Sequence, residues 1–153
     1  MKMTNVNEVL TFAIRKEADA AAFYRMAADR SNPSLKKAFE ELAKDEDGHK
    51  KKLETLDLKK VGQSKVEPAK ESVPGLGIAE MFSDVPYSPD MSYADLLRMA
   101  MKNEEASHHL YASAAQAVSE PGVKKLLLAL AQEETAHRDK LEKIYDKDIL
   151  QEF

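Results

Sequence analysis

The sequence contains two Glu-x-x-His motifs, Glu46 with His49 and Glu134 with His137. Residues three positions apart lie on one face of an α-helix, so each motif presents a carboxylate beside an imidazole. Carboxylate oxygens and imidazole nitrogens both bind divalent metal ions. These four residues are therefore candidate metal ligands, provided that their helices bury them.

Two further predicted helices carry a carboxylate within an apolar stripe, at Glu17 and at Glu104. Each stripe advances in alternating steps of four and three residues, as expected for a helix face packed in a core. The first stripe consists of Val6, Leu10, Ala13, Glu17, Ala20, Tyr24 and Ala27. Because burying an unpaired charge costs on the order of several kcal/mol, a carboxylate at such a position requires a partner.

Four long amphipathic helices are predicted to position these six residues. Asn5 and Ser92 are suitable N-cap residues, and Pro33 and Pro121 suit the first position of a helix. The predicted helices span residues 6–29, 33–56, 92–118 and 121–147. The sequence therefore predicts an all-α fold.

The connection between the second and third helices, residues 58–91, contains four prolines and three glycines. Such a long connection is unusual within a domain. We interpret it as a crossover that returns along the helices, with Met81 and Phe82 as anchors in the core. A flexible linker between two separate domains is the alternative, although two-helix units rarely bury enough surface alone.

The two halves of the chain repeat one another. Glu17 corresponds to Glu104 at an offset of 87 residues, and the two Glu-x-x-His motifs correspond at an offset of 88 residues. Two such helical hairpins, packed through their stripes, would form a four-helix bundle. Since every polar residue in the stripes lies near the middle of its helix, we expect all six to meet at one level of the core.

Four buried carboxylates without cations would repel one another and stay protonated. Two divalent ions would neutralise them and leave two imidazoles as further ligands. Oxygen and nitrogen donors without sulfur suit iron or manganese, and zinc less distinctively. We therefore predict a binuclear site formed by Glu17, Glu46, His49, Glu104, Glu134 and His137.

This constellation resembles the ferritin-like superfamily and, within it, the rubrerythrin-type di-iron proteins. The resemblance covers nearly the whole chain outside residues 58–91, so residues 1–153 are expected to form one ferritin-like domain. It implies two iron ions held by three kinds of ligand: bridging Glu46 and Glu134, outer Glu17 and Glu104, and one histidine for each iron, His49 and His137.

The resemblance also implies a function, namely reduction of hydrogen peroxide or oxygen, or oxidation of ferrous iron. It further implies a homodimer. Typical rubrerythrins carry a rubredoxin-like Cys₄ domain, whereas this chain has no cysteine. Electrons would then come from a separate protein such as a rubredoxin. Typical members also carry an extra carboxylate where this chain has Ser107.

Two other classes of function use the same residues. The chain could be a non-catalytic metal-binding or iron-handling protein that serves sensing, delivery or storage. It could also be a purely structural bundle or adaptor whose polar residues fix the register of the helices.

Other polar residues near the motifs have simpler interpretations. Glu105 and His108 form a third Glu-x-x-His match, but Glu105 lies off the apolar stripe, so we interpret it as a surface residue. His108 is expected to be partly exposed, with a second-sphere role left open, and His109 is expected at the surface. Asp45 and Glu133, which precede the bridging candidates, are interpreted as solvated.

Tyr24 and Tyr111 lie seven residues after Glu17 and Glu104 on the same stripes. A tyrosine at such a position is commonly a core residue with a satisfied hydroxyl group. The duplicated placement makes a hydrogen bond close to the metals an equally strong hypothesis.

Composition excludes several classes of protein. The absence of cysteine excludes disulfides, thiolate zinc sites and iron–sulfur centres in this chain. The net charge of −4, without a basic cluster, gives no reason to expect a nucleic-acid partner. The sequence shows neither an apolar signal core nor a membrane-spanning segment, so we expect a cytoplasmic protein.

Overall fold

The computed structural model describes residues 5–56, 81–82, 87–88 and 90–149. The described residues form four long helices: α1 (Val6–Asp29), α2 (Pro33–Glu54), α4 (Tyr93–Ala117) and α5 (Pro121–Asp148). The predicted helix ends lie within two residues of these bounds. No strand occurs within the described helices and connections, so the predicted all-α fold is confirmed.

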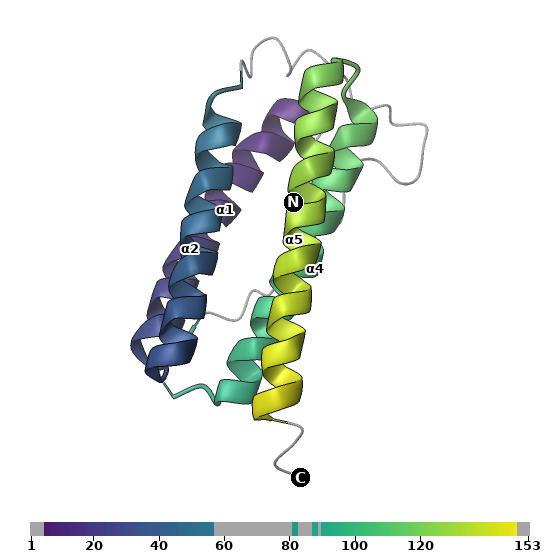
Figure 1. The fold of residues 1–153 in the computed structure, drawn as a ribbon. Coiled ribbons are helices and arrows are strands. Elements are labelled where there is room, and N and C mark those ends of the chain that lie inside the picture. Colours follow the sequence, from purple (N-terminus) through teal and green to yellow (C-terminus); the bar gives the residue numbers. More distant parts are fainter. Residues whose placement is uncertain (1–4, 57–80, 83–86, 89, 150–153) are drawn as a thin grey trace.

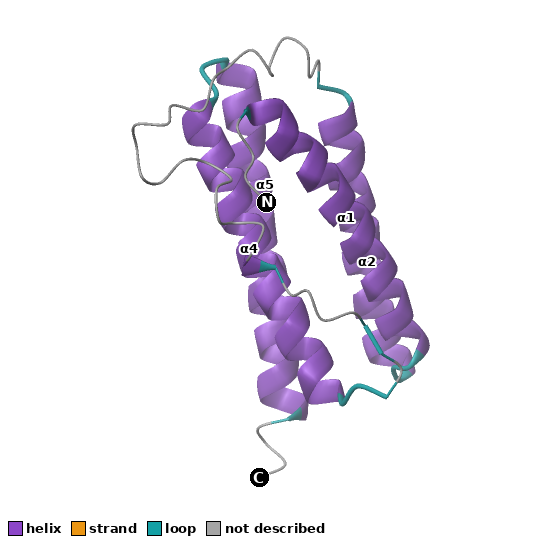
Figure 2. Cartoon of the chain, turned by 180° about the vertical axis from the view of Figure 1, so that it is seen from behind, coloured by secondary structure: helices purple, strands orange, loops and turns teal. Residues whose placement is uncertain are grey.

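The four helices form a bundle of two hairpins (Figure 1). Within each hairpin, α1 with α2 and α4 with α5, the helices pack closely along their lengths, whereas α1 and α4 approach each other over a short stretch. The view from behind shows the same arrangement, with the hairpins side by side (Figure 2). The predicted four-helix bundle is confirmed.

Each helix begins after a residue whose side chain accepts a hydrogen bond from at least one of the free backbone amides of the first turn. The side chains of Asn5, Asn32 and Ser92 accept hydrogen bonds from backbone N–H groups three residues later. Glu120 does the same at the start of α5, where its carboxylate accepts from the N–H groups of Gly122 and Val123. These caps fix the start of each helix and thereby its register in the bundle.

The apolar core consists of two clusters. One cluster includes Leu10, Leu53 and Leu127, and the other includes Phe39 and Leu97. Along every helix the polar stripe residues lie between the residues of the two clusters. The six polar residues therefore form a layer that separates two apolar regions, and we refer to these residues as the polar layer.

Phe82 confirms one of the two anchors predicted in the connection. Its ring lies 5.6 Å from that of Phe12 and is buried. The prediction for Met81 is wrong, because its side chain is 39% exposed. The other residues of the predicted crossover lie mostly outside the described part of the chain.

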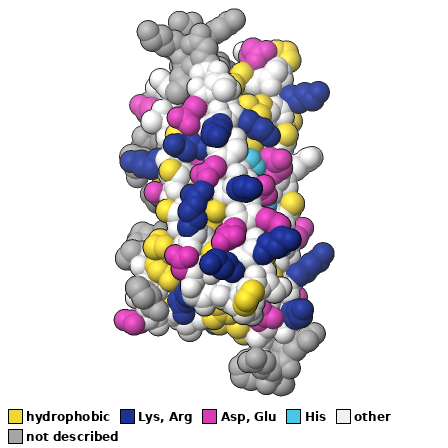
Figure 3. Space-filling model, turned by 60° about the vertical axis from the view of Figure 1, so that its left-hand side comes forward, with side chains coloured by type: hydrophobic (Ala, Val, Ile, Leu, Met, Phe, Trp, Pro, Cys, Tyr) yellow, Lys and Arg dark blue, Asp and Glu magenta, His cyan; other side chains and the backbone are white. Residues whose placement is uncertain are grey.

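The outer surface is strongly polar. On the face drawn in Figure 3, basic and acidic side chains are interspersed over the helices. None of the described helices is both long and apolar enough to cross a membrane.

Candidate metal centre

The structure brings all six predicted ligands together in the polar layer. Their side chains come from the middle of all four helices and are between 0% and 7% exposed: Glu17, Glu46, His49, Glu104, Glu134 and His137. They are the buried polar and charged residues of the described chain. A helical bundle places them there because each occupies a stripe position flanked by apolar residues.

The donor atoms form two overlapping groups. The first comprises Glu17, Glu46, His49 and Glu134, and the second comprises Glu46, Glu104, Glu134 and His137. In each group one donor atom from every residue lies within 4.8 Å of the others. Glu46 and Glu134 belong to both groups, which is the arrangement expected of carboxylates shared by two metal ions.

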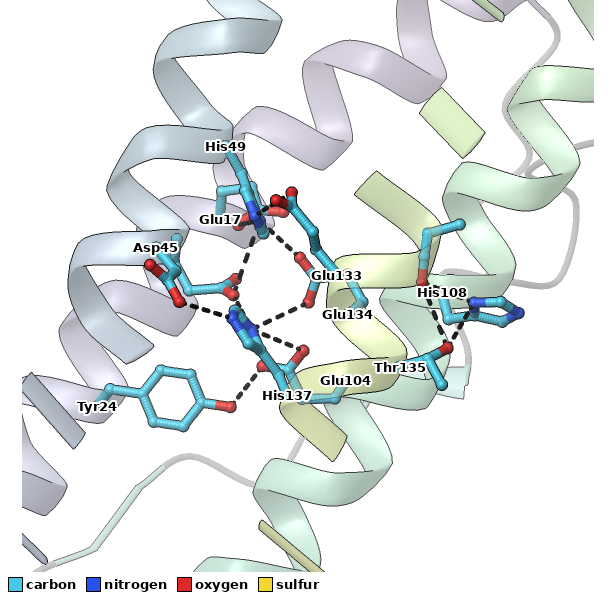
Figure 4. A network of polar contacts seen from close by, with 12 residues as sticks. Glu17, Tyr24, Asp45, His49, Glu104, His108, Glu133, Glu134, Thr135 and His137 are labelled. Carbon is cyan, nitrogen blue, oxygen red and sulfur yellow. Dashed lines mark hydrogen bonds and ion pairs between the residues drawn. The ribbon is translucent and has the colours of Figure 1, made fainter. Parts of the chain in front are cut away.

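The closest contacts of the histidines cross from one hairpin to the other (Figure 4). His49 Nδ1 lies 2.8 Å from Glu134 Oε1 and 3.8 Å from Oε1 of Glu46, its neighbour on α2. His137 Nδ1 likewise lies 2.7 Å from Glu46 Oε1 and 4.0 Å from Glu134 Oε2. Each motif therefore completes its group with residues of the opposite half.

Several donor atoms in the layer have no hydrogen-bond partner among the described residues. These atoms are Glu17 Oε2, Glu46 Oε1, Glu104 Oε2, Glu134 Oε2 and His137 Nδ1. Glu46 Oε1 and His137 Nδ1 are close to each other but are not aligned as a hydrogen bond. Buried polar atoms are normally paired. Divalent cations bound between these atoms would satisfy them, so the residues fit a metal centre.

Electrostatics favours the same conclusion. Burial, followed by the negative charge of Glu104, raises the pKa values of Glu46 and Glu134 well above the ordinary value. Burial also acts to raise the pKa of Glu17, but the close contacts of its carboxyl group with His49 and Glu46 outweigh burial and lower this pKa. Without cations, the layer therefore keeps protons that bound metal ions would displace.

The pKa of His137 is raised. Burial acts to lower it, but the nearby carboxylates of Glu104 and Asp45 outweigh the effect of burial. A protonated imidazole in this position carries some of the positive charge that the carboxylates require. A metal ion would replace that proton.

Both stripe tyrosines donate hydrogen bonds to carboxylates of the opposite hairpin. The Tyr24 hydroxyl donates to Glu104 Oε1, and the Tyr111 hydroxyl donates to Glu17 Oε1. The hypothesis of a hydrogen bond close to the ligands is therefore confirmed for both residues. Each bond occupies one carboxylate oxygen, and Oε2 of the same carboxylate is the atom left without a partner. Burial, followed by the charge of the bonded carboxylate, raises both tyrosine pKa values well above the ordinary value.

Asp45 and Glu133 are solvated, as predicted, but they also contact the imidazoles, which the sequence analysis did not predict. They are 59% and 48% exposed, yet Asp45 Oδ2 lies 3.1 Å from His137 Nε2, and Glu133 Oε2 lies 2.9 Å from His49 Nε2. A carboxylate that accepts the Nε2–H proton leaves the Nδ1 lone pair free for a metal. Both residues immediately precede a shared carboxylate in the two halves, and this duplication was the signal in the sequence.

The third Glu-x-x-His match lies outside the centre. Glu105 is 54% exposed and His109 is exposed, as predicted for surface residues. His108 is half-buried, and its Nδ1 lies 2.8 Å from the Ala131 carbonyl oxygen and 2.9 Å from Thr135 Oγ1 (Figure 4). It belongs to neither donor group, and its hydrogen-bond contacts are with Ala131 and Thr135 rather than with the predicted ligands.

Comparison with known proteins agrees with this geometry. One similar crystal structure, described as a ferritin-like diiron-carboxylate protein from Thermotoga maritima, superposes with a TM-score of 0.70 at 24% sequence identity. The match covers 94% of this chain and 96% of the other, and at this identity it shows the fold. No curated protein matches the sequence. The model of the rubrerythrin family matches residues 8–145. The chain therefore belongs to the rubrerythrin family.

Proposed function

We propose that this chain is a binuclear non-haem iron protein that reduces peroxide or oxygen, oxidises ferrous iron, or does both. The observation that supports this proposal best is the pair of donor groups that share Glu46 and Glu134. Two carboxylates common to both groups would hold two ions close together. Such a pair can deliver two electrons to one oxidant.

The donor set suits iron or manganese. Each group offers three carboxylates and one imidazole and no sulfur, which suits iron or manganese better than zinc. Bound ferrous ions would supply the electrons that reduce the oxidant.

The protein itself contributes orientation and burial. The tyrosine hydroxyls hold one oxygen of Glu17 and of Glu104, which orients the other oxygen toward the layer. Asp45 and Glu133 orient the imidazoles through Nε2, as carboxylates commonly do for metal-bound histidines. The apolar clusters on both sides bury the layer, and a buried environment strengthens the electrostatic interactions of the site.

We also propose that electrons come from a separate protein such as a rubredoxin and that the chain acts as a cytoplasmic homodimer. The first proposal is supported by the lack of cysteine, because a rubredoxin-type centre needs four thiolates. The second is supported only by the resemblance to rubrerythrins.

Stopped-flow spectroscopy tests the activity. The protein is loaded anaerobically with ferrous iron and mixed with hydrogen peroxide or with oxygen, while absorption is followed in the near-ultraviolet. We expect oxidation to be fast compared with free ferrous iron in the same buffer. Glu134→Ala, which removes a shared carboxylate, should react at the rate of free iron. Equal rates for the wild-type protein and this variant would contradict the proposal.

The alternative is a non-catalytic iron-handling protein. It is supported by the same ligands and by the lack of a redox centre of its own within the 153 residues. In that case the wild-type protein would bind iron fully but react no faster than free iron with either oxidant. Metal content measured on the same samples separates this outcome from a failure to bind iron.

A further inference from the structure

The cavity that reaches the polar layer between α1 and α4 has no part in the function proposed above. It has a volume of about 190 Å³ and is lined from both helices and from Phe82 and Tyr87. Its buried end is formed by Tyr24, Glu104 and Ala100, which are between 1% and 3% exposed. The cavity therefore runs from the surface to one of the outer carboxylates.

The walls of the cavity are mainly apolar and partly aromatic. The Phe23 ring lies 6.0 Å from the Tyr87 ring in an edge-to-face arrangement, and the thioethers of Met26 and Met99 also line the space. Aromatic edges and methionine sulfur atoms make favourable contacts with a further aromatic ring. Such walls select a planar apolar molecule.

Charges around the cavity disfavour an anion. Asp19 and Glu104 contribute carboxylates, whereas Lys16 is the cation among the described lining residues. Lys16 Nζ lies 4.0 Å from Asp19 Oδ2 and 5.1 Å from the centre of the Phe82 ring, so its charge is already partly compensated. Ser107 and Asn103 also line the cavity and bring uncharged polar side chains to its wall.

The size of the cavity limits the occupant. An apolar cavity of about 150 Å³ holds a benzene molecule. A space of about 190 Å³ therefore suits a neutral molecule with one or two fused rings.

We propose that this cavity is a binding site for a small, neutral aromatic molecule, seated against Tyr24 and Glu104. It adjoins only one of the two donor groups, because Glu104 lines it and Glu17 does not. The described residues of the walls include no histidine, since both histidine ligands come from α2 and α5. The bound molecule would therefore approach the centre from its carboxylate side.

Titration with defined probes tests the proposal in the metal-free and the iron-loaded protein. The neutral probes are indole and phenol, and benzoate is the charged probe. Isothermal calorimetry should give a Kd of about 0.1 to 1 mM for indole, and benzoate should bind at least about tenfold more weakly. Methionine methyl resonances locate the site: those of Met26 and Met99 should shift, whereas that of Met91, which does not line the cavity, should not.

Substitutions that fill the cavity give the clearest test of indole binding. Ala20→Phe on α1 and Ser107→Leu on α4 should each raise the Kd of indole about tenfold or more. Ala22→Phe is the matched control, since Ala22 is exposed on the same helix and does not line the cavity. Metal content of the variants should stay at the wild-type value, which shows that they fold.

The proposal is overturned if no probe binds, if both filling variants bind indole as tightly as the wild-type protein, or if Ala22→Phe weakens binding equally. Because binding is measured with and without iron, its failure is separate from failure of the redox function. A protein that binds indole but holds no iron would retain the aromatic site and lose the proposed di-iron centre.

Discussion

The interior of the bundle contains two apolar clusters and, between them, the polar layer. In the clusters, side chains such as Leu10 and Leu97 are fully buried, and their packing requires nothing beyond the chain itself. The polar layer is equally buried, yet five of its donor atoms lack a partner within the described chain. The comparison shows that the clusters stabilise the fold, whereas the layer is complete only with a ligand of positive charge.

Replacing ligands should have the largest effect, and it should distinguish shared from unshared carboxylates. Glu46→Ala and Glu134→Ala remove a residue common to both donor groups and should abolish binding of both metals. Glu17→Ala and Glu104→Ala each affect one group and should leave about one metal ion per chain. Elemental analysis per chain measures this. Full occupancy in either shared-ligand variant would show that the layer is not the metal site.

Removing the metal should have the next largest effect. An ion present at about 1,000 times its Kd stabilises the native state by about 4 kcal/mol. For a chain of this length, that corresponds to a fall in Tm of about 10 °C after chelation. Differential scanning calorimetry of iron-loaded and chelated protein measures the shift. Identical Tm values would mean that the layer is stable without cations, as the purely structural hypothesis requires.

Substitutions in the apolar clusters should lower the stability of the fold without lowering its metal content. Leu97→Ala creates a cavity and should lower the free energy of unfolding by about 3 kcal/mol. Metal content should remain at the wild-type value, because Leu97 belongs to the core and to neither donor group. Urea denaturation and elemental analysis give the two readings. If this variant lost its metals, packing in the clusters and metal binding in the layer would not be independent of each other.

Replacing the carboxylates that contact the imidazoles should have a smaller effect on metal binding. Asp45→Asn and Glu133→Gln weaken the orientation of His137 and His49 and should each reduce metal affinity about tenfold. Competition with a chromophoric chelator measures the affinity. Asp47→Asn is the control, since Asp47 pairs with Arg25 on the surface. A control that lost as much affinity as the other two variants would indicate a general effect of surface charge.

The smallest effect should be the pH dependence of the metal-free protein. The pKa values of Glu46, Glu134 and His137 are raised in the folded state, so their stabilising contribution is present at low pH and lost as pH rises through those values. The lowered pKa of Glu17 acts in the opposite direction, but only as pH falls below about 4.5. Stability should therefore decrease between about pH 5 and pH 8.

Glu134→Gln should flatten this dependence, because the amide does not titrate. Urea denaturation at several pH values, with and without iron, measures it. Iron should reverse the trend, since protons compete with metal ions for the ligands. Stability of the metal-free protein that rises over the same interval would contradict the assigned protonation.

The sequence was sufficient to predict the helices and the six residues of the layer. Their types and their place in apolar stripes required a buried charged site, and duplication showed that no member was accidental. The sequence did not show that the closest contacts join the two hairpins, as between His49 and Glu134. The spacing within one helix says nothing about which neighbour on another helix comes closest.

The contacts of Asp45 and Glu133 with the imidazoles were not predicted, for a related reason. Each lies one position away from a stripe, and the periodicity assigns such a position to solvent. In the structure the side chain is half-exposed, but its carboxylate reaches the imidazole edge across the gap between α2 and α5. Met81 and Phe82 show the same limit, because hydrophobicity alone did not indicate which of two adjacent residues would point inward.

The crossing of polar contacts between the hairpins has a consequence for symmetry. Each hairpin contributes to the polar layer one outer glutamate and one Glu-x-x-His motif, with one tyrosine that donates a hydrogen bond to the outer glutamate of the other hairpin. Each hairpin needs the other to complete a donor group. Two identical hairpins related by a twofold axis would offer the same donors, with self-complementary contacts. The chain thus has the design of a closed dimer joined into one polypeptide, and the two joined copies are free to diverge.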